Sequence, residues 1–228
     1  MAEAPLRLAV LVSGRGSNLQ ALIDAIAAGR LPATIAGVFS DKRKAYALER
    51  ARLAGIHAEA VSPRDHCDRL AFDEAMFERV AAVQPRLVVC AGYMRLISAQ
   101  VVERWLGRMI NIHPSLLPAY QGLHTHERVL QAGDGRHGAS VHFVTPELDG
   151  GPVLAQAPIA VEAGDTPEGL AARLLPREHR LMVASVELLA RRRVNLTALG
   201  IAVDGRLLDA PLELHEDDRL YDRAGFIA

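Results

Sequence analysis

A short apolar run with almost no polar interruption, residues 7–12, lies near the start of the chain and limits the folds open to it. A strand that is apolar at nearly every position is typical of burial on both faces, as in parallel sheets. Similar runs follow at residues 33–39, 57–61, 87–91 and 109–112. Helical patterns separate them at residues 18–28, at 45–54 and in a stretch that ends before Pro85. This alternation predicts an α/β fold: a single Rossmann-like, three-layer domain with a mostly parallel central sheet.

The alternation of apolar runs and helical patterns ends at about Pro118. Residues 138–144 and 152–159 have the pattern of two further strands. Thr166 then begins a long helix that extends to about Arg191, which Pro176 is expected to kink or interrupt. Beyond it, two apolar stretches flank Asp204-Gly205, a pair typical of a hairpin turn. We therefore expect a domain over residues 1–190, with a phosphate- and nucleotide-binding first half and a folate-binding second half, and a C-terminal extension over 191–228.

Charge and cysteine content narrow the class of protein. The 228 residues carry 26 basic and 27 acidic side chains, so no bulk field favours nucleic acid or a membrane surface. No apolar run is long enough to span a bilayer, and the first residues lack the pattern of a secretory signal. With two cysteines at no metal-like spacing, a cytoplasmic protein is the simplest interpretation. Cys90 falls in a strand-like apolar run, where a small core residue is more common than a nucleophile.

The glycine-rich segment Ser13-Gly-Arg-Gly-Ser-Asn18 joins the first expected strand to the first expected helix. Glycines allow the backbone to approach a ligand closely, and a helix N-terminus offers N–H groups to an anion. We favour a phosphate monoester as that ligand. A dinucleotide fingerprint is the rival, weakened because Leu19 replaces its third glycine, although Asp41 could still bind a ribose. A bare turn without a ligand is the third interpretation.

Asn111 and His113 are one residue apart at the end of an expected strand, so both side chains project to one face. Acyl transfer to an amine needs a hydrogen-bond donor for the carbonyl oxygen and a group that moves a proton. The carboxamide of Asn111 suits the first task and the imidazole of His113 the second. Asp149, beside two glycines, is a candidate partner that would raise the pKa of His113. Considered without its motif, each of these residues also has a purely structural interpretation.

Taken together, the motifs resemble the folate-dependent glycinamide ribonucleotide formyltransferases of purine synthesis. The matching segments occur in the family's order within residues 7–185 and are Ser13–Asn18, Val38–Ser40, Ala91–Arg95, Asn111–Pro118, Gly122–His126, His137–Phe143 and Glu147–Pro152. The most specific is Asn111-Ile-His-Pro-Ser-Leu-Leu-Pro118, which related folate formyltransferases share. The first loop resembles the substrate-phosphate loop of the glycinamide ribonucleotide branch. The resemblance implies formyl transfer from the cosubstrate 10-formyltetrahydrofolate to the amine of 5-phosphoribosylglycinamide, with no covalent enzyme intermediate.

The resemblance also implies roles for individual residues. The ribonucleotide would be bound by Gly16, Ser17, Asn18 and Glu178. The folate would be bound by Arg69, Met94, Arg95, Leu96, Ile97 and Asn111. The catalytic group would be Asn111, His113 and Asp149, with His113 as proton donor and Asp149 holding its charge.

Other functions stay open at this stage. A 10-formyltetrahydrofolate hydrolase would use water in place of the amine, and a methionyl-tRNA formyltransferase would share the motif around His113. A non-catalytic folate or nucleotide binder and a Rossmann-type oxidoreductase are more distant alternatives. A metal site at His113, His124 and His126 lacks a completing acid or cysteine, so we expect no metal. The expected partners are the two small-molecule substrates, with no nucleic acid or membrane, in a monomer or homodimer.

Overall fold

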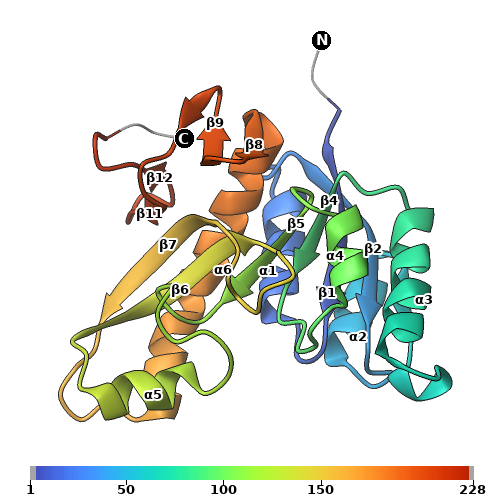
Figure 1. Cartoon of the computed structure of the whole chain (residues 1–228), viewed down its shortest axis with the longest axis horizontal. Helices are drawn as coiled ribbons and strands as arrows, with labels where there is room; N and C mark the ends of the chain where they lie inside the picture. Colours follow the sequence, from blue (N-terminus) through green and yellow to red (C-terminus); the bar gives the residue numbers. More distant parts are fainter. Residues whose placement is uncertain (1–3, 226–228) are drawn as a thin grey trace. The chain divides into compact units, whose positions relative to one another are not determined.

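The computed structural model describes residues 4–225 (Figure 1). Contacts within the chain divide it into two compact units, Met1–Asn111 and Ile112–Ala228, and each is described by itself. In Figure 1 the first unit runs from blue to green and the second from green to red. Within the described residues, no helix combines the length and apolar character needed to cross a bilayer.

The first unit is built on parallel strands. These are β1 (Leu6–Val12), β2 (Ala33–Ser40), β3 (Ala58–Ala60), β4 (Leu87–Cys90) and the part of β5 (Met109–His113) that precedes Ile112. Their order is β3-β2-β1-β4-β5, and every pair is parallel. Almost all residues of β1 and all of β4 are buried, as the nearly continuous apolar runs require. The expected α/β class with a mostly parallel sheet is confirmed.

Helices connect these strands. They are α1 (Ser17–Ala27), α2 (Tyr46–Leu53), the 3₁₀ turn η1 (Pro63–Asp65), α3 (Arg69–Ala82) and α4 (Ala99–Arg104). Because parallel crossovers are right-handed, connections that proceed in opposite directions along the sheet place their helices on opposite faces. Accordingly α1 contacts α2, and α3 contacts α4. Two helical layers therefore enclose the sheet of this unit, in agreement with the predicted three layers. The short helix α4 was not expected from the sequence.

The strand order reverses between β1 and β4. In open α/β sheets, such a reversal point is where ligands bind, at the carboxyl ends of the strands. The loop that follows β1 begins at Ser13, and its N–H donates to the carbonyl of Gly92, just after β4, over 3.0 Å. The glycine-rich loop and the segment after β4 thus meet at the position where open α/β sheets bind ligands.

The second unit combines antiparallel and parallel pairs. Its helices are α5 (Thr125–Ala132) and α6 (Pro167–Arg191), and its strands are β6 (Arg136–Phe143), β7 (Val153–Ala160), β8 (Val194–Thr197), β9 (Gly200–Val203), β10 (Arg206–Leu207), β11 (Leu212–Leu214) and β12 (Leu220–Tyr221). Strand β6 pairs antiparallel with β7, and β7 pairs in parallel with β11. Helix α6 packs on β6 and β7, as Figure 1 also shows. The helix α5 was not anticipated.

The long helix α6 begins as the sequence predicts. Thr166 caps it by accepting a hydrogen bond from the N–H of Gly169 over 3.1 Å, and Pro167 occupies its first position. The helix continues through Pro176 to Arg191, so of the two expected effects of this proline, a kink or an interruption, the interruption is wrong. Buried leucines on both sides of the proline, Leu174 and Leu181, hold α6 against the rest of the unit, and this packing outweighs one missing backbone hydrogen bond.

The C-terminal segment is folded back onto this unit. Strands β8, β9 and β10 form a small antiparallel sheet. The predicted turn at Asp204-Gly205 is confirmed, because both residues have the positive φ values, 50° and 84°, of a type I′ hairpin. From α6, Arg177 pairs with Glu216 over 2.7 Å, and Arg180 pairs with Asp218. The division at residue 190 remains an expectation.

Candidate active site

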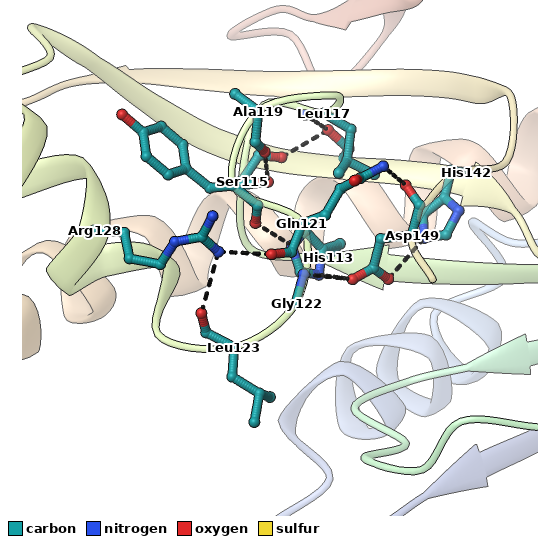
Figure 2. Close-up of polar contacts among 12 residues, drawn as sticks. His113, Ser115, Leu117, Ala119, Gln121, Gly122, Leu123, Arg128, His142 and Asp149 are labelled. Carbon is teal, nitrogen blue, oxygen red and sulfur yellow. Dashed lines mark hydrogen bonds and ion pairs between the residues drawn. The ribbon is translucent and has the colours of Figure 1, made fainter. Parts of the chain in front are cut away.

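His113 is held at the end of β5 with its imidazole almost fully buried. Its Nε2 lies 3.0 Å from the carbonyl oxygen of Tyr120 and its Nδ1 lies 3.4 Å from Oδ2 of Asp149 (Figure 2). A carbonyl only accepts hydrogen bonds, so Nε2 carries the hydrogen of that contact. The nitrogen that gains and loses a proton is therefore Nδ1, which faces the carboxylate.

The protonation state of His113 follows from opposing influences. Burial lowers the pKa of His113, while the Tyr120 carbonyl and the Asp149 carboxylate raise it, and the net result lies below the ordinary value. The imidazole is therefore neutral near pH 7 and able to accept a proton. Once protonated, it has a carboxylate beside it that stabilises the new charge.

Asp149 is fixed from several directions. Its Oδ2 accepts a hydrogen bond from the N–H of Gly122 over 2.9 Å, and its carbonyl oxygen accepts one from Gln121 over 3.2 Å. Burial raises the pKa of Asp149, but the imidazole of His142, the Gly122 N–H and the charge of His113 outweigh burial, so the net pKa is lowered. The carboxylate is therefore ionised at neutral pH and held in one position.

The segment from Tyr120 to Gly122 holds both partners together. Its carbonyl at Tyr120 orients His113, and its N–H at Gly122 holds Asp149. Arg128 of α5 fixes the segment by donating to the Gln121 carbonyl over 2.6 Å (Figure 2). Tyr120 and Gly122 have positive φ values of 56° and 81°, which permit the tight turn. No pattern in the sequence indicates that this turn serves as the frame of the site.

His142 is a further residue of the site, one to which the sequence gives no role. Its Nε2 lies 3.6 Å from Oδ1 of Asp149, the carboxylate oxygen that does not face His113 (Figure 2). Its Nδ1 contacts the Phe143 carbonyl over 3.0 Å, which orients the ring. Asp149 thus contacts two imidazoles, one through each oxygen. No spacing in the sequence points to this contact, because His142 and Asp149 meet only after the turn that follows β6.

We expect His142→Phe to lower turnover by about three- to tenfold, the effect of losing one hydrogen-bonding partner of a buried group. The phenyl ring keeps the bulk of the side chain but cannot hydrogen-bond to Asp149, so the carboxylate is less firmly held. Steady-state kinetics of the variant provide the measurement, with His57→Phe on an exposed surface as the matched control. Turnover of the His142 variant within the error of wild type would leave His142 with a packing role only.

The loop that carries Asp149 depends on Gly151. A Cβ atom there would lie 1.8 Å from the carbonyl oxygen of Phe143, which no real contact allows. A Cβ at Gly150 would meet only the side chain of Glu147, at 2.8 Å, and that exposed side chain can move. The close approach of backbone to backbone at Gly151 sets the course of the loop and with it the position of Asp149.

Gly151→Ala should therefore displace the loop, cost about 1–3 kcal/mol in the free energy of unfolding and reduce turnover. Gly150→Ala is the matched control and should stay close to wild type in both measurements. Chemical denaturation and kinetics on the two variants provide the comparison. Equal behaviour of the two alanine variants would contradict this account of the loop.

The glycine-rich loop of the first unit has the form of an anion site. Gly16 precedes α1 with a φ of 72°, and a Cβ there would lie 2.5 Å from the Cβ of Ala47. The loop is fixed to α2, since the Gly14 carbonyl accepts from the Ala47 N–H over 3.1 Å. Ser17 and Asn18 open the helix, and within the described part of the chain neither a capping side chain nor an acidic residue occupies its first turn. The N-terminal N–H groups of α1 can therefore bind an anion.

The segment expected to bind folate also lies in the first unit. Met94 and Leu96 expose 62% and 46% of their surface, unusually much for large apolar side chains, whereas Ile97 is buried. The guanidinium of Arg95 lies 5.0 Å from the ring centre of Phe72, in the first turn of α3. Arg69 is the first residue of the same helix. The structure thus brings Arg69 and the segment around Arg95 to one turn of α3.

The remaining residues lie elsewhere in the chain. Asn111 is in β5 opposite Cys90 of β4, and its partial burial leaves part of the residue accessible. Glu178 lies in α6, in the second unit. Over residues 4–225, no group of three or more histidine, cysteine or acidic side chains is arranged to hold a metal ion.

Several known proteins resemble the chain in sequence and structure. Residues 6–186 match the formyl transferase family. The phosphoribosylglycinamide formyltransferase of Escherichia coli (strain K12) is 43% identical over 203 residues, 89% of this chain and 96% of the relative. A solved structure of the phosphoribosylglycinamide formyltransferase from Coxiella burnetii is 42% identical, with a TM-score of 0.86 over 90% of this chain and 96% of that one. A formyltetrahydrofolate deformylase from Pseudomonas putida KT2440 is more distant, at 26% identity and a TM-score of 0.78 over 89% of this chain and 72% of that one.

Proposed function

Because the chain belongs to the formyl transferase family, we propose that it transfers the formyl group of 10-formyltetrahydrofolate to the amine of 5-phosphoribosylglycinamide. The products are formylglycinamide ribonucleotide and tetrahydrofolate, a step of purine synthesis that leads to IMP. The observation that carries the proposal is the contact of 3.4 Å between Nδ1 of His113 and Oδ2 of Asp149. A neutral imidazole beside an ionised carboxylate is the arrangement that proton transfer between two nitrogens requires.

The reaction is an acyl transfer between nitrogens. The amine attacks the formyl carbon, a new carbon–nitrogen bond forms, and the carbonyl oxygen gains negative charge that the Asn111 carboxamide stabilises by donating a hydrogen bond. His113 accepts the proton that the amine loses and delivers it to N10 of the folate as the old carbon–nitrogen bond breaks. Asp149 stabilises the imidazolium that exists between these two transfers.

Direct attack by the amine is supported because the two side chains that could act as nucleophiles, Cys90 and Ser115, are not in a reactive form. Burial raises the pKa of the Cys90 thiol to about 12, so the thiolate is not populated at neutral pH. Ser115, next to the site, donates its hydroxyl hydrogen to the Ala119 carbonyl over 2.6 Å. Neither side chain is prepared to form an acyl intermediate, and an amine needs none.

We assign substrate binding to the residues suggested by the family resemblance. The phosphate is bound at Gly16, Ser17 and Asn18, where α1 presents its N–H groups. Glu178 binds the ribose hydroxyls. The folate is bound by Arg69, Met94, Arg95, Leu96, Ile97 and Asn111. The exposure of Met94 and Leu96 supports this assignment, since a large apolar pair at a sheet switch point marks a ligand surface.

The proposal also covers the ligands, cellular location, oligomeric state and domain bounds of the enzyme. The reaction consumes two small molecules and requires no metal, nucleic acid or membrane. We propose a cytoplasmic monomer or homodimer in which residues 1–190 form the formyltransferase domain and 191–228 an extension.

A formyl-transfer assay tests the proposal. Purified protein is given 10-formyltetrahydrofolate with and without phosphoribosylglycinamide, and release of tetrahydrofolate is followed. Release that depends on the ribonucleotide, with formylated product, is the expected result. Release without the ribonucleotide would instead favour a hydrolase, the activity named for the more distant deformylase. Binding of both ligands without release would identify a non-catalytic binder.

A further inference from the structure

Ser13 connects the two ligand-binding segments of the first unit. Its hydroxyl donates to Oδ1 of Asp41 over 2.6 Å and accepts the N–H of Met94 over 2.9 Å. Its own N–H donates to the Gly92 carbonyl over 3.0 Å. Ser13 is the first residue of the loop proposed to bind phosphate, and Met94 is the first residue of the segment proposed to bind folate.

The direction of these hydrogen bonds is fixed by Asp41. A hydroxyl has one hydrogen, and the carboxylate of Asp41 can only accept it. The lone pairs of Oγ are therefore directed to other donors, and the Met94 N–H takes one of them. Both Ser13 and Asp41 are buried, which excludes water as a substitute partner and strengthens the bond. Asp41, the rival candidate for binding a dinucleotide ribose, is thus engaged within the protein.

The far end of the folate segment is held by a second buried carboxylate. Asp73 of α3 accepts hydrogen bonds from the N–H and the hydroxyl of Ser98, over 2.7 and 2.6 Å. Residues 94–97 therefore extend between two fixed ends. Met94 and Leu96, whose side chains are exposed, lie between those ends and cannot hold themselves in place by packing.

We propose that Ser13, oriented by Asp41, is a positioning residue that sets the conformation of the folate segment at Met94. The inference deepens the proposed function and depends on the folate being bound at residues 94–97. Without the Ser13 hydroxyl, the Met94 N–H loses its acceptor and the segment relaxes toward water. Folate binding then has to restore the ordered conformation, which weakens the affinity. The ribonucleotide, bound at the other end of the loop, is affected little.

Ser13→Ala tests this directly. Dissociation constants for tetrahydrofolate and for phosphoribosylglycinamide are measured by titration calorimetry on the full chain, together with KM and kcat. We expect the dissociation constant and KM for the folate to rise about five- to tenfold, the effect of one lost hydrogen bond. The ribonucleotide constant should stay within about twofold, and kcat at saturating folate should be nearly unchanged, because the chemical groups are intact. Ser62→Ala, which removes a hydroxyl that accepts from the Arg64 N–H in η1, is the matched control.

Asp41 provides a second, independent pair of variants. Asp41→Asn keeps an oxygen that can accept the Ser13 hydroxyl and should bind folate within about threefold of wild type. Asp41→Ala removes the acceptor and should resemble Ser13→Ala. The double variant Ser13→Ala with Asp41→Ala should be no weaker than either single variant, because both changes remove the same interaction.

The results separate the inference from the function on which it depends. If wild-type protein binds neither ligand, the proposed function fails. If wild type binds both but Ser13→Ala leaves the folate constant unchanged, or weakens folate and ribonucleotide equally, the positioning role is overturned. An Asp41→Asn protein as weak as Asp41→Ala would also overturn it, since the charge and not the orientation of Ser13 would then be decisive.

Discussion

Replacing His113 by alanine should lower the turnover number by about 10²- to 10⁴-fold, the range in which a positioned acid–base group contributes to a rate. The imidazole is the group in the site whose Nδ1 is neutral near pH 7 and faces a carboxylate that stabilises its protonated form. Without it, the proton of the attacking amine has to reach N10 through solvent. Release of tetrahydrofolate under saturating substrates measures the effect.

Binding should survive the same substitution. His113 is assigned to proton transfer, so the dissociation constants of both substrates are expected to change less than about threefold, since only interactions made in the transition state are lost. His57→Ala, on an exposed surface of the first unit, is the control for removing an imidazole. A His113→Ala protein with more than a tenth of wild-type turnover would rule out His113 as the group that moves the proton.

The sheet of the first unit could be predicted because its signals are local. The apolar runs that became β1 and β4 are buried along their length, and each is followed by the turn residues expected after a parallel strand. The sequence signals for helix starts are local as well, as at Thr166, whose hydroxyl caps α6. In such segments, propensity and pattern agree with the tertiary environment, and the sequence is sufficient.

Elements whose stability comes from distant contacts were missed. Helix α5 has only eight residues, too few to be stable alone, and it contacts α6, which is remote in sequence. Pro176 illustrates the opposite error, since a local rule predicted an interruption that packing of α6 on β6 and β7 prevents. In both cases tertiary packing outweighs the local preference.

The sequence likewise predicted some contacts of the candidate site and missed others. Asn111 and His113 share one face of a strand by the two-residue period alone. The contact of His113 with Asp149 joins residues that are far apart in the sequence, and no spacing specifies it. It forms because the turn at Tyr120–Gly122 offers a carbonyl to one residue and an N–H to the other. His142 joins them from β6. It lies in the matching segment His137–Phe143, but no spacing within that segment points to its contact with Asp149.

Asp149→Asn should lower turnover by at least about a hundredfold and move the acidic limb of the pH–rate profile to lower pH. The carboxylate raises the pKa of His113, so its removal lowers that pKa further below the ordinary value. His113 has to be neutral at Nδ1 to accept the proton of the amine, and activity therefore rises with pH through the pKa of His113. A lower pKa shifts this rise downward, while the loss of stabilisation of the imidazolium reduces the plateau.

The shift of the acidic limb and the height of the plateau distinguish an electrostatic role of Asp149 from a role in holding its loop in place. The carboxamide introduced by Asp149→Asn keeps an oxygen for the Gly122 N–H, so the turn that holds His113 should be retained, whereas Asp149→Ala should disturb it as well. Measuring kcat from about pH 5 to about pH 9 on both variants, a range that spans the titration of an imidazole, gives the limb and the plateau separately. A reduced plateau with an unshifted limb would mean that Asp149 acts only by shaping the loop. If activity instead fell as pH rose through the pKa of His113, and this alkaline limb moved to lower pH in Asp149→Asn, His113 would have to start the reaction protonated. The order of proton transfers proposed for the amine would then be reversed.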